Sequence, residues 1–255
     1  MKRFSILLLA GLLGACAAPN GSQLSPTGQA DVKRRTDIRL ELATAYFTGG
    51  QAEIALQELN RALELSPRRA DVLGLRALVL MQIGDSEAAG QSLREALRIE
   101  PDNPSLQNNM GWFLCQRGEF DKAMSYFERA LSTKSYASPQ KALLNAGLCR
   151  MRQGERTQAE AFLRRALDAE PANLQAHAGL ARLAYDRADY VRARSHLLKV
   201  IESEQAAAEN FLMAVLIERK LGDAASEQSL LAQWRRRFPQ SPQLTAYLRG
   251  ETDDK

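Results

Sequence analysis

The sequence offers few of the side chains on which most catalytic and metal sites depend. Its 255 residues include two histidines and three cysteines, and the histidines do not have the spacing of a metal-binding pair. It contains no glycine-rich loop that would cradle a phosphate and no serine-centred turn that would expose a nucleophile. We therefore expect no catalytic residue, no metal, no cofactor and no small-molecule substrate, and a protein that is not an enzyme.

A surplus of one charge is also missing. Lys and Arg number 34 against 30 for Asp and Glu, and Lys2 and Arg3 lie in a segment that we expect to be removed. The remaining chain is nearly balanced, which gives no support to a nucleic-acid partner. We interpret the three arginines at 235–237 as a solvated helix face rather than a phosphate site.

The apolar run at the N-terminus is short. Residues 6–13 are apolar or small and follow Lys2 and Arg3, and they are too few to span a bilayer. This pattern predicts a secretory signal peptide over residues 1–15 rather than a transmembrane helix.

The run ends in Leu13-Gly14-Ala15-Cys16, which resembles the lipobox of bacterial lipoproteins. The resemblance implies that Cys16 is the acylated first residue of the mature protein, and its acyl chains would anchor the protein stably in a membrane. Ala17 stands where an aspartate would argue for retention in the inner membrane, so we expect the periplasmic face of the outer membrane. A plain signal peptide with an incidental cysteine is the alternative.

The segment after the cysteine contains Pro19, Asn20, Gly21, Ser22, Ser25, Pro26 and Gly28 and shows no helical period as far as Arg35. We therefore expect residues 16–35 to form a lipidated, flexible tether between the membrane and the folded part. A random coil of this length reaches on the order of 25 Å from the membrane.

A period of 34 residues runs through most of the remaining chain. Six copies span residues 36–69, 70–103, 104–137, 140–173, 174–207 and 208–241, with two extra residues between the third and fourth copies. In the first five copies, small residues stand at positions 8 and 20, a small residue or valine stands at position 27, and a large apolar residue stands at position 24. Small residues let two antiparallel helices approach closely, and the large residues fill the space around them.

Turn residues recur in the same register. Position 32 is proline in four copies, where it ends the second helix because it lacks an amide hydrogen. Position 15 is glycine in five copies, which suits the turn after the first helix. The glycines are Gly50, Gly84, Gly118, Gly154 and Gly222.

This pattern resembles the tetratricopeptide-repeat (TPR) family over residues 36–241. The resemblance implies an all-α fold, a right-handed superhelix (solenoid) of six helix-turn-helix repeats. The sixth copy departs at positions 20 and 27, as expected of a terminal repeat. Residues 242–255 would form a C-terminal capping segment around Leu244, Tyr247 and Leu248, followed by a disordered tail.

The histidines and the two remaining cysteines fall inside the repeats. His177 occupies position 4, a core position, and we interpret it as a packed residue rather than a ligand. Cys115 and Cys149 stand at positions 12 and 10 of adjacent copies, which point in different directions at about 100° per residue. We expect free thiols, with a disulfide in the oxidising periplasm as the alternative.

One stripe of each first helix lines the inner face of such a superhelix, at positions 2, 5, 9 and 12. In the first four copies this stripe carries many large apolar residues, with asparagines at its edge. Such a stripe predicts a groove for an apolar peptide or helix; the alternative is that neighbouring helices or the tether cover it. The predicted groove residues are Leu40, Phe47, Leu78, Met81, Asn108, Asn109, Trp112, Asn145 and Leu148, and the stripe also holds Leu144 and Met151.

The third and fourth copies carry a closer resemblance. Residues 108–118 (NNMGWFLCQRG) and 145–149 (NAGLC), with the insertion at 136–139, resemble the PilF/PilW lipoproteins of type IV pili. The resemblance implies a pilotin, an outer-membrane lipoprotein that helps the pilus secretin to reach that membrane and assemble into its ring. The implied partner is the secretin, bound in the groove of the early repeats by a monomeric protein that supports pilus biogenesis and twitching motility.

A second interpretation fits the same repeats. A TPR lipoprotein also serves as an adaptor that recruits peptidoglycan hydrolases or another envelope assembly. Neighbouring pilus-assembly genes would favour the pilotin, and capture of hydrolases would favour the adaptor.

Overall fold

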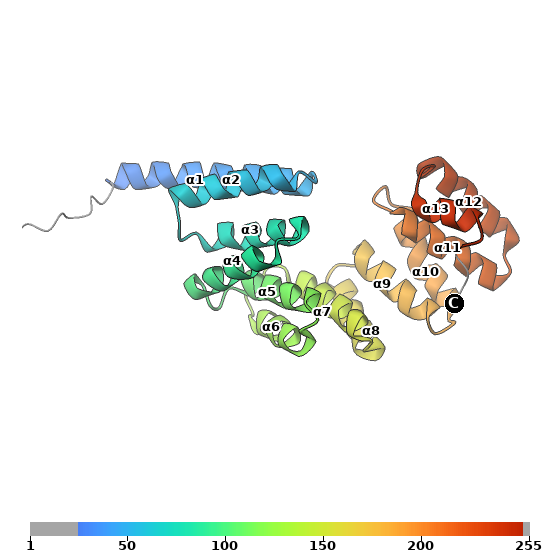
Figure 1. Ribbon diagram of the computed structural model, residues 1–255. Coiled ribbons are helices and arrows are strands. Elements are labelled where there is room, and N and C mark those ends of the chain that lie inside the picture. The colour runs from blue at the N-terminus through green and yellow to red at the C-terminus, as the bar shows by residue number, and fades with distance from the viewer. Residues whose placement is uncertain (1–24, 252–255) are drawn as a thin grey trace, which may run out of the picture.

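The structure, a computed structural model, describes residues 25–251, and this part of the chain folds into thirteen α-helices and no strand (Figure 1). The all-α solenoid predicted from the sequence is confirmed. The helices are α1 (Pro26–Thr48), α2 (Ala52–Leu65), α3 (Ala70–Ile83), α4 (Ser86–Ile99), α5 (Pro104–Gln116), α6 (Phe120–Ser132), α7 (Pro139–Gln153), α8 (Arg156–Ala169), α9 (Leu174–Tyr185), α10 (Tyr190–Ile201), α11 (Ala208–Leu221), α12 (Ala224–Arg237) and α13 (Pro242–Leu248).

Successive pairs of helices form the hairpins of six repeats. Every second helix, from α2 to α12, begins at position 17 of its copy. The glycine at position 15 has a positive φ in each of the five copies that carry one, between 73° and 94°, which turns the chain at the end of the first helix. The second helices α2, α4, α8 and α12 each end two residues before a proline, because the residue before proline is driven out of the helical region.

Small residues lie where the two helices of each hairpin touch. The alanines at position 20 of the first five copies have no solvent exposure. A side chain on Gly111, at position 8, would place its Cβ 2.7 Å from the ring of Phe127, at position 24. The hairpin is therefore closed by fitting a large side chain against a residue that has none.

The hairpins stack in chain order, so the two ends of the described chain lie at opposite ends of the array (Figure 1). Each second helix packs on the first helix of the next repeat, and α1, α3, α5, α7 and α9 also contact one another in sequence. The extra residues before α7 are accommodated by Tyr136, which is buried against Ala130 and Ala142.

The helix α13 closes the C-terminal end of the stack. It packs on α11, as α7 packs on α5. Leu244 is buried in the last core cluster, and the ring of Tyr247 lies 5.7 Å from that of Trp234 between centroids. Leu248 points to solvent, with 53% of its surface exposed, so two of the three expected capping residues make the contact.

The expectation of a flexible tether as far as Arg35 is wrong for residues 26–35. These ten residues form the first part of α1, which has 23 residues and projects beyond its partner α2. Ser25 caps the helix by accepting a hydrogen bond from the amide of Gly28, and Pro26 occupies the first turn, where its fixed φ suits a helix. The ion pair of Lys33 with Asp37, one turn apart, adds support.

The predicted signal peptide, Cys16 and residues 17–24 lie outside the described residues, as does the chain after residue 251. No helix in the described part of the chain combines the length and hydropathy that a membrane crossing requires.

Candidate partner-binding groove

First helices of five successive repeats line one groove, which we call the inner groove. It has a volume of about 640 Å³ and takes side chains from α1, α3, α5, α7 and α9 only. The lining residues are Phe47, Leu78, Met81, Gln82, Asn108, Asn109, Trp112, Gln116, Lys141, Leu144, Asn145 and Gln175.

The positions of these residues within their repeats explain why they line the inner groove. The lining residues stand at positions 2, 5, 6, 9, 12 and 13 of their copies. At about 100° per residue these positions fall within one third of the helix circumference. Gln82 and Gln116, at position 13, were missed by the sequence reasoning, although position 13 is one turn beyond position 9 on the same stripe.

Seven of the nine predicted groove residues line the inner groove, together with Leu144. Leu40 does not, because it packs against the core of the first repeat. Leu148 and Met151 pack against the core between the fourth and fifth repeats. Whether the lining residues bind a partner remains a prediction.

The apolar lining is less exposed than solvent-facing positions would be. Phe47, Leu78, Met81 and Trp112 are half-buried, and Leu144 is only 7% exposed. Neighbouring helices therefore cover part of the stripe, as the alternative interpretation held. The surface that remains is hollowed rather than flat, which suits the burial of an apolar ligand.

A row of asparagine side chains crosses the floor of the inner groove. Asn145 on α7 donates through Nδ2 to Oδ1 of Asn108 on α5, at 3.0 Å. Asn108 in turn donates to Oδ1 of Asn109, at 3.4 Å. The pair Asn108–Asn145 thus fixes the rotamers of two amides across a repeat boundary.

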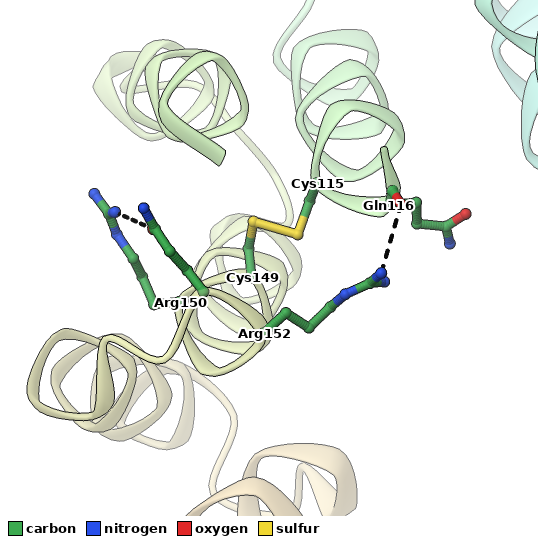
Figure 2. Close-up of a disulfide and its surroundings, with 6 residues drawn as sticks. Cys115, Gln116, Cys149, Arg150 and Arg152 are labelled. Atoms are coloured by element: carbon green, nitrogen blue, oxygen red, sulfur yellow. Dashed lines mark hydrogen bonds between the residues drawn. A yellow bond between two sulfur atoms is a disulfide. The ribbon is translucent and has the colours of Figure 1, made fainter. Parts of the chain in front are cut away.

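A disulfide joins the same two helices (Figure 2). Cys115 and Cys149 are bonded, with their Cα atoms 5.8 Å apart, so the expectation of free thiols is wrong. Positions 12 and 10 differ by about 200° around a helix, which on a single helix would point the two side chains apart. However, α5 and α7 lie side by side, so residues that meet must lie on opposite faces of their own helices.

Positive charge accompanies the apolar lining. Lys141 is the one charged residue among the lining residues. Three turns further along α7, Arg152 reaches across to α5 and donates to the backbone oxygen of Gln116, at 3.5 Å (Figure 2). The lining contains no aspartate or glutamate.

A second hollow lies at the start of the stack and was missed by the sequence reasoning. The hollow has a volume of about 500 Å³, and we call the surface around it the N-terminal end face. It contains Ile38 and Leu42, which are 48% and 43% exposed. Their counterparts at positions 3 and 7 of the third and fourth copies are buried, because a second helix of the preceding repeat covers them. The signal was present in the sequence as apolar residues at stacking positions of the first copy. The face is completed by Arg35, Arg39, Arg61, Glu64 and Leu65.

The two histidines lie against each other between α9 and α10. His177 is 3% exposed, and its Nδ1 lies 3.0 Å from Nδ1 of His196. Its Nε2 donates to the backbone oxygen of Pro171, at 3.0 Å. The interpretation of His177 as a packed residue agrees with this burial. Within residues 25–251, no group of three or more metal-ligating side chains comes together.

Known proteins similar to this chain agree on its architecture. Family models described as tetratricopeptide repeat match residues 40–104, and also 80–146 and 150–215. The type IV pilus assembly protein PilF of Pseudomonas aeruginosa is 24% identical over 235 residues, which are 92% of each chain.

Solved structures show the same architecture. The crystal structure of PilW, described as a widely conserved type IV pilus biogenesis factor, superimposes with a TM-score of 0.72. It is 32% identical, and the match covers 84% of this chain and 98% of that one. The structure of Pseudomonas aeruginosa PilF has a TM-score of 0.71 at 22% identity, over 86% of this chain and 99% of the other, and supports the fold.

Proposed function

Because this chain belongs to the tetratricopeptide-repeat family and is a PilF/PilW-type member of it, we propose that it serves type IV pilus biogenesis as a pilotin. In this role it binds the pilus secretin, helps it to reach the outer membrane and promotes its assembly into a ring. The observation that carries the proposal is the match to PilW over nearly the whole of that chain.

The inner groove supports a role in binding protein. It offers half-buried apolar side chains beside amides, and it spans five repeats. Buried Leu- or Phe-sized anchors each contribute roughly 1.5–3 kcal/mol to association. A row of such anchors suits a protein segment better than a small molecule, because the lining side chains come from five successive repeats.

The location of the protein is part of the proposal. We propose that Cys16 is acylated and holds the protein on the periplasmic face of the outer membrane, supported by the lipobox at Leu13 to Cys16 and by Ala17. Cys16→Ser would then lose palmitate labelling and move from the membrane fraction to the soluble fraction. Continued fractionation with membranes would contradict the anchor.

The test of the proposed function compares secretin multimers in cells with and without this protein. We expect deletion to leave the secretin monomer at normal abundance, while the heat-resistant multimer and the pili are lost. Re-expression of the wild-type chain restores both. Normal multimers and normal pili in the deletion strain would overturn the pilotin proposal and direct attention to an adaptor for peptidoglycan hydrolases.

A further inference from the structure

The N-terminal end face leaves apolar side chains uncovered at one end of the stack, which is formed by α1 and α2 (Figure 1). Ile38 and Leu42 lie one turn apart on α1 and are 48% and 43% exposed. Leu65 of α2 lines the same hollow and is half-buried. Apolar side chains gathered on an exposed surface mark a contact with a partner or with a membrane.

The first repeat also carries a charge where the other repeats carry none. Arg39 is the fourth residue of its copy, and its side chain is 36% exposed. The same position is buried and holds leucine, glutamine, histidine or phenylalanine in the other five copies. Arg39 and Arg61 share the buried carboxylate of Glu58, at 2.6 and 2.5 Å. The end face is therefore built to keep guanidinium groups beside its apolar side chains.

Positive charge is in excess on this face. Arg35, Arg39 and Arg61 line the hollow, and Glu64 is the one carboxylate among its lining residues. The excess remains when the buried Glu58 is counted. Arginine side chains place their aliphatic stems on apolar surface and their charged ends in a polar layer, so this combination suits the boundary between lipid headgroups and acyl chains.

The chain reaches this face close to the proposed lipid anchor. Ser25, the cap of α1, follows Cys16 by nine residues, which span at most about 30 Å when fully extended. Leu42 lies roughly 25 Å further along α1, at 1.5 Å per residue. A link this short holds the end face at a high effective concentration beside the lipid, so that even a weakly binding surface remains bound.

We propose that the N-terminal end face docks on the surface of a bilayer that contains anionic phospholipid. Arg35, Arg39 and Arg61 lie among the phosphates, and Ile38 and Leu42 enter the boundary between headgroups and acyl chains. The docking gives α1 a fixed orientation on the membrane.

This inference rests on the proposed acylation of Cys16, which brings the end face to the membrane. It also specifies how the proposed pilotin is presented to its partner. Because the repeats stack in chain order from this end (Figure 1), the later repeats extend away from the bilayer. The inner groove then opens into the space above the lipid surface.

Two protein occupants fit this face less well. A second copy bound face to face would set three arginines against three arginines, and the like charges would repel. A helix of the kind that precedes α5 covers Leu106 and Met110, which are buried. On the end face the same helix would also take water from the guanidinium of Arg39, which is costly for a charged group.

The experiment uses the full-length, acylated chain in vesicles of phosphatidylethanolamine with about one-fifth phosphatidylglycerol. Leu42→Cys carries a nitrobenzoxadiazole fluorophore, and quenching by nitroxide-labelled phospholipid is measured. The acyl chains hold the protein on the vesicles in every case, so quenching reports the orientation of the face. We expect at least twofold quenching of this label. The same label on Leu248→Cys, an exposed leucine at the other end of the stack, should be unaffected.

Paired variants separate the two components of the surface. Arg34→Gln/Arg35→Gln removes two exposed charges near the hollow, and Arg235→Gln/Arg236→Gln removes an equivalent exposed pair on α12. We expect quenching at position 42 to fall at least twofold in the first and to remain in the second.

The apolar component has its own pair. Ile38→Gln should also reduce the quenching at position 42. Val191→Gln changes an apolar residue on α10 that is 70% exposed and should not alter it. Circular dichroism of each variant checks that its helical content matches that of wild type.

Each remaining outcome decides against the proposal. Equal quenching at positions 42 and 248, or full quenching in Arg34→Gln/Arg35→Gln, overturns the docking. A label at position 42 that is shielded from aqueous iodide but not quenched by nitroxide is covered by protein, which overturns it as well. If the wild-type chain does not float with the vesicles, the anchor fails and the docking fails with it. If the chain floats without quenching while secretin multimers depend on it, this inference fails and the proposed function survives.

Discussion

Gln107 and His177 occupy the same place in two different repeats. Each is the fourth residue of its copy, and each donates through its terminal nitrogen to the backbone oxygen of the proline six residues before it, at 2.9 Å for Gln107 and 3.0 Å for His177. A carbonyl oxygen only accepts, so neutral His177 carries its hydrogen on Nε2. Its Nδ1 must then accept from Nδ1–H of His196.

This relationship predicts how stability depends on pH. Burial lowers the pKa of both histidines below the ordinary 6.5. A group with a lowered cationic pKa binds fewer protons in the folded than in the unfolded protein, so its contribution to stability is full above pH 6.5 and declines as the pH falls below it. His177→Gln should keep the bond to Pro171 and remove one titrating group. We expect a smaller drop in Tm between pH 7.5 and 5 for His177→Gln than for wild type. If Tm falls by the same amount in His177→Gln and in wild type, the contribution of the buried histidine pair to the pH dependence of stability would be contradicted.

A single alanine stands where the repeat pattern requires a glycine. Ala188 is at position 15 of the fifth copy and has a φ of 59°, the one positive φ at a non-glycine residue in the described chain. A left-handed conformation costs an alanine about 1–2 kcal/mol, and the extra freedom of unfolded glycine offsets roughly half of this. Ala188→Gly should stabilise the protein by about 0.5–1 kcal/mol, measured by urea denaturation. Gly84→Ala, the reverse change in the second copy, should destabilise it. A loss of stability in Ala188→Gly would contradict the assignment of this turn.

The disulfide predicts sensitivity to reduction. Cys115 and Cys149 close a loop with a sequence separation of 34, and crosslinks of this kind typically contribute about 2–4 kcal/mol. The double variant Cys115→Ser/Cys149→Ser should lose about this much in denaturant unfolding. Dithiothreitol should lower the stability of wild type and leave the double variant unchanged. Free thiols detected in the folded, oxidised wild type would contradict the bond.

A substitution of Leu78 should affect partner binding without affecting folding. It is half-buried in the inner groove, while Leu73, Ala77 and Leu80 of the same helix form the core. Leu78→Asp should therefore retain its helical content and lose at least tenfold in affinity for the secretin, because a charge replaces an apolar anchor. Arg236→Glu, an exposed change on α12, should alter neither. Wild-type retention of the secretin by a folded Leu78→Asp protein would contradict the groove as the binding site.

The repeat architecture was predictable because its signals are periodic. A buried alanine such as Ala89 recurs at one position in five copies, and the helix starts follow from the same register. The first part of α1 has no such signal, since residues 26–35 project beyond α2 and, within the described part of the chain, need no apolar face. Its helicity depends on the cap at Ser25 and on local ion pairs, which carry no period.

The sequence predicts which face of the first helices forms the candidate groove, but not how deeply its residues are buried. Angles around one helix place Leu78 and Trp112 on a common stripe. They do not say how far α3, α5 and α7 close over that stripe, because this depends on the stacking of whole repeats. The same limit hid the disulfide, which requires knowledge of how α5 faces α7, and the exposed end face around Ile38, which results from the absence of a preceding repeat in the described chain.

The crosslink between α5 and α7 also has a mechanical consequence. A solenoid transmits tension through its repeat interfaces in series, and each interface yields independently because repeats contact mainly their neighbours. The disulfide crosses the interface between the third and fourth repeats and prevents that interface from separating. Under load along the superhelix, extension therefore occurs at the repeat interfaces on either side of the bond. The distance between α5 and α7, which sets the width of the inner groove at its centre, stays constant.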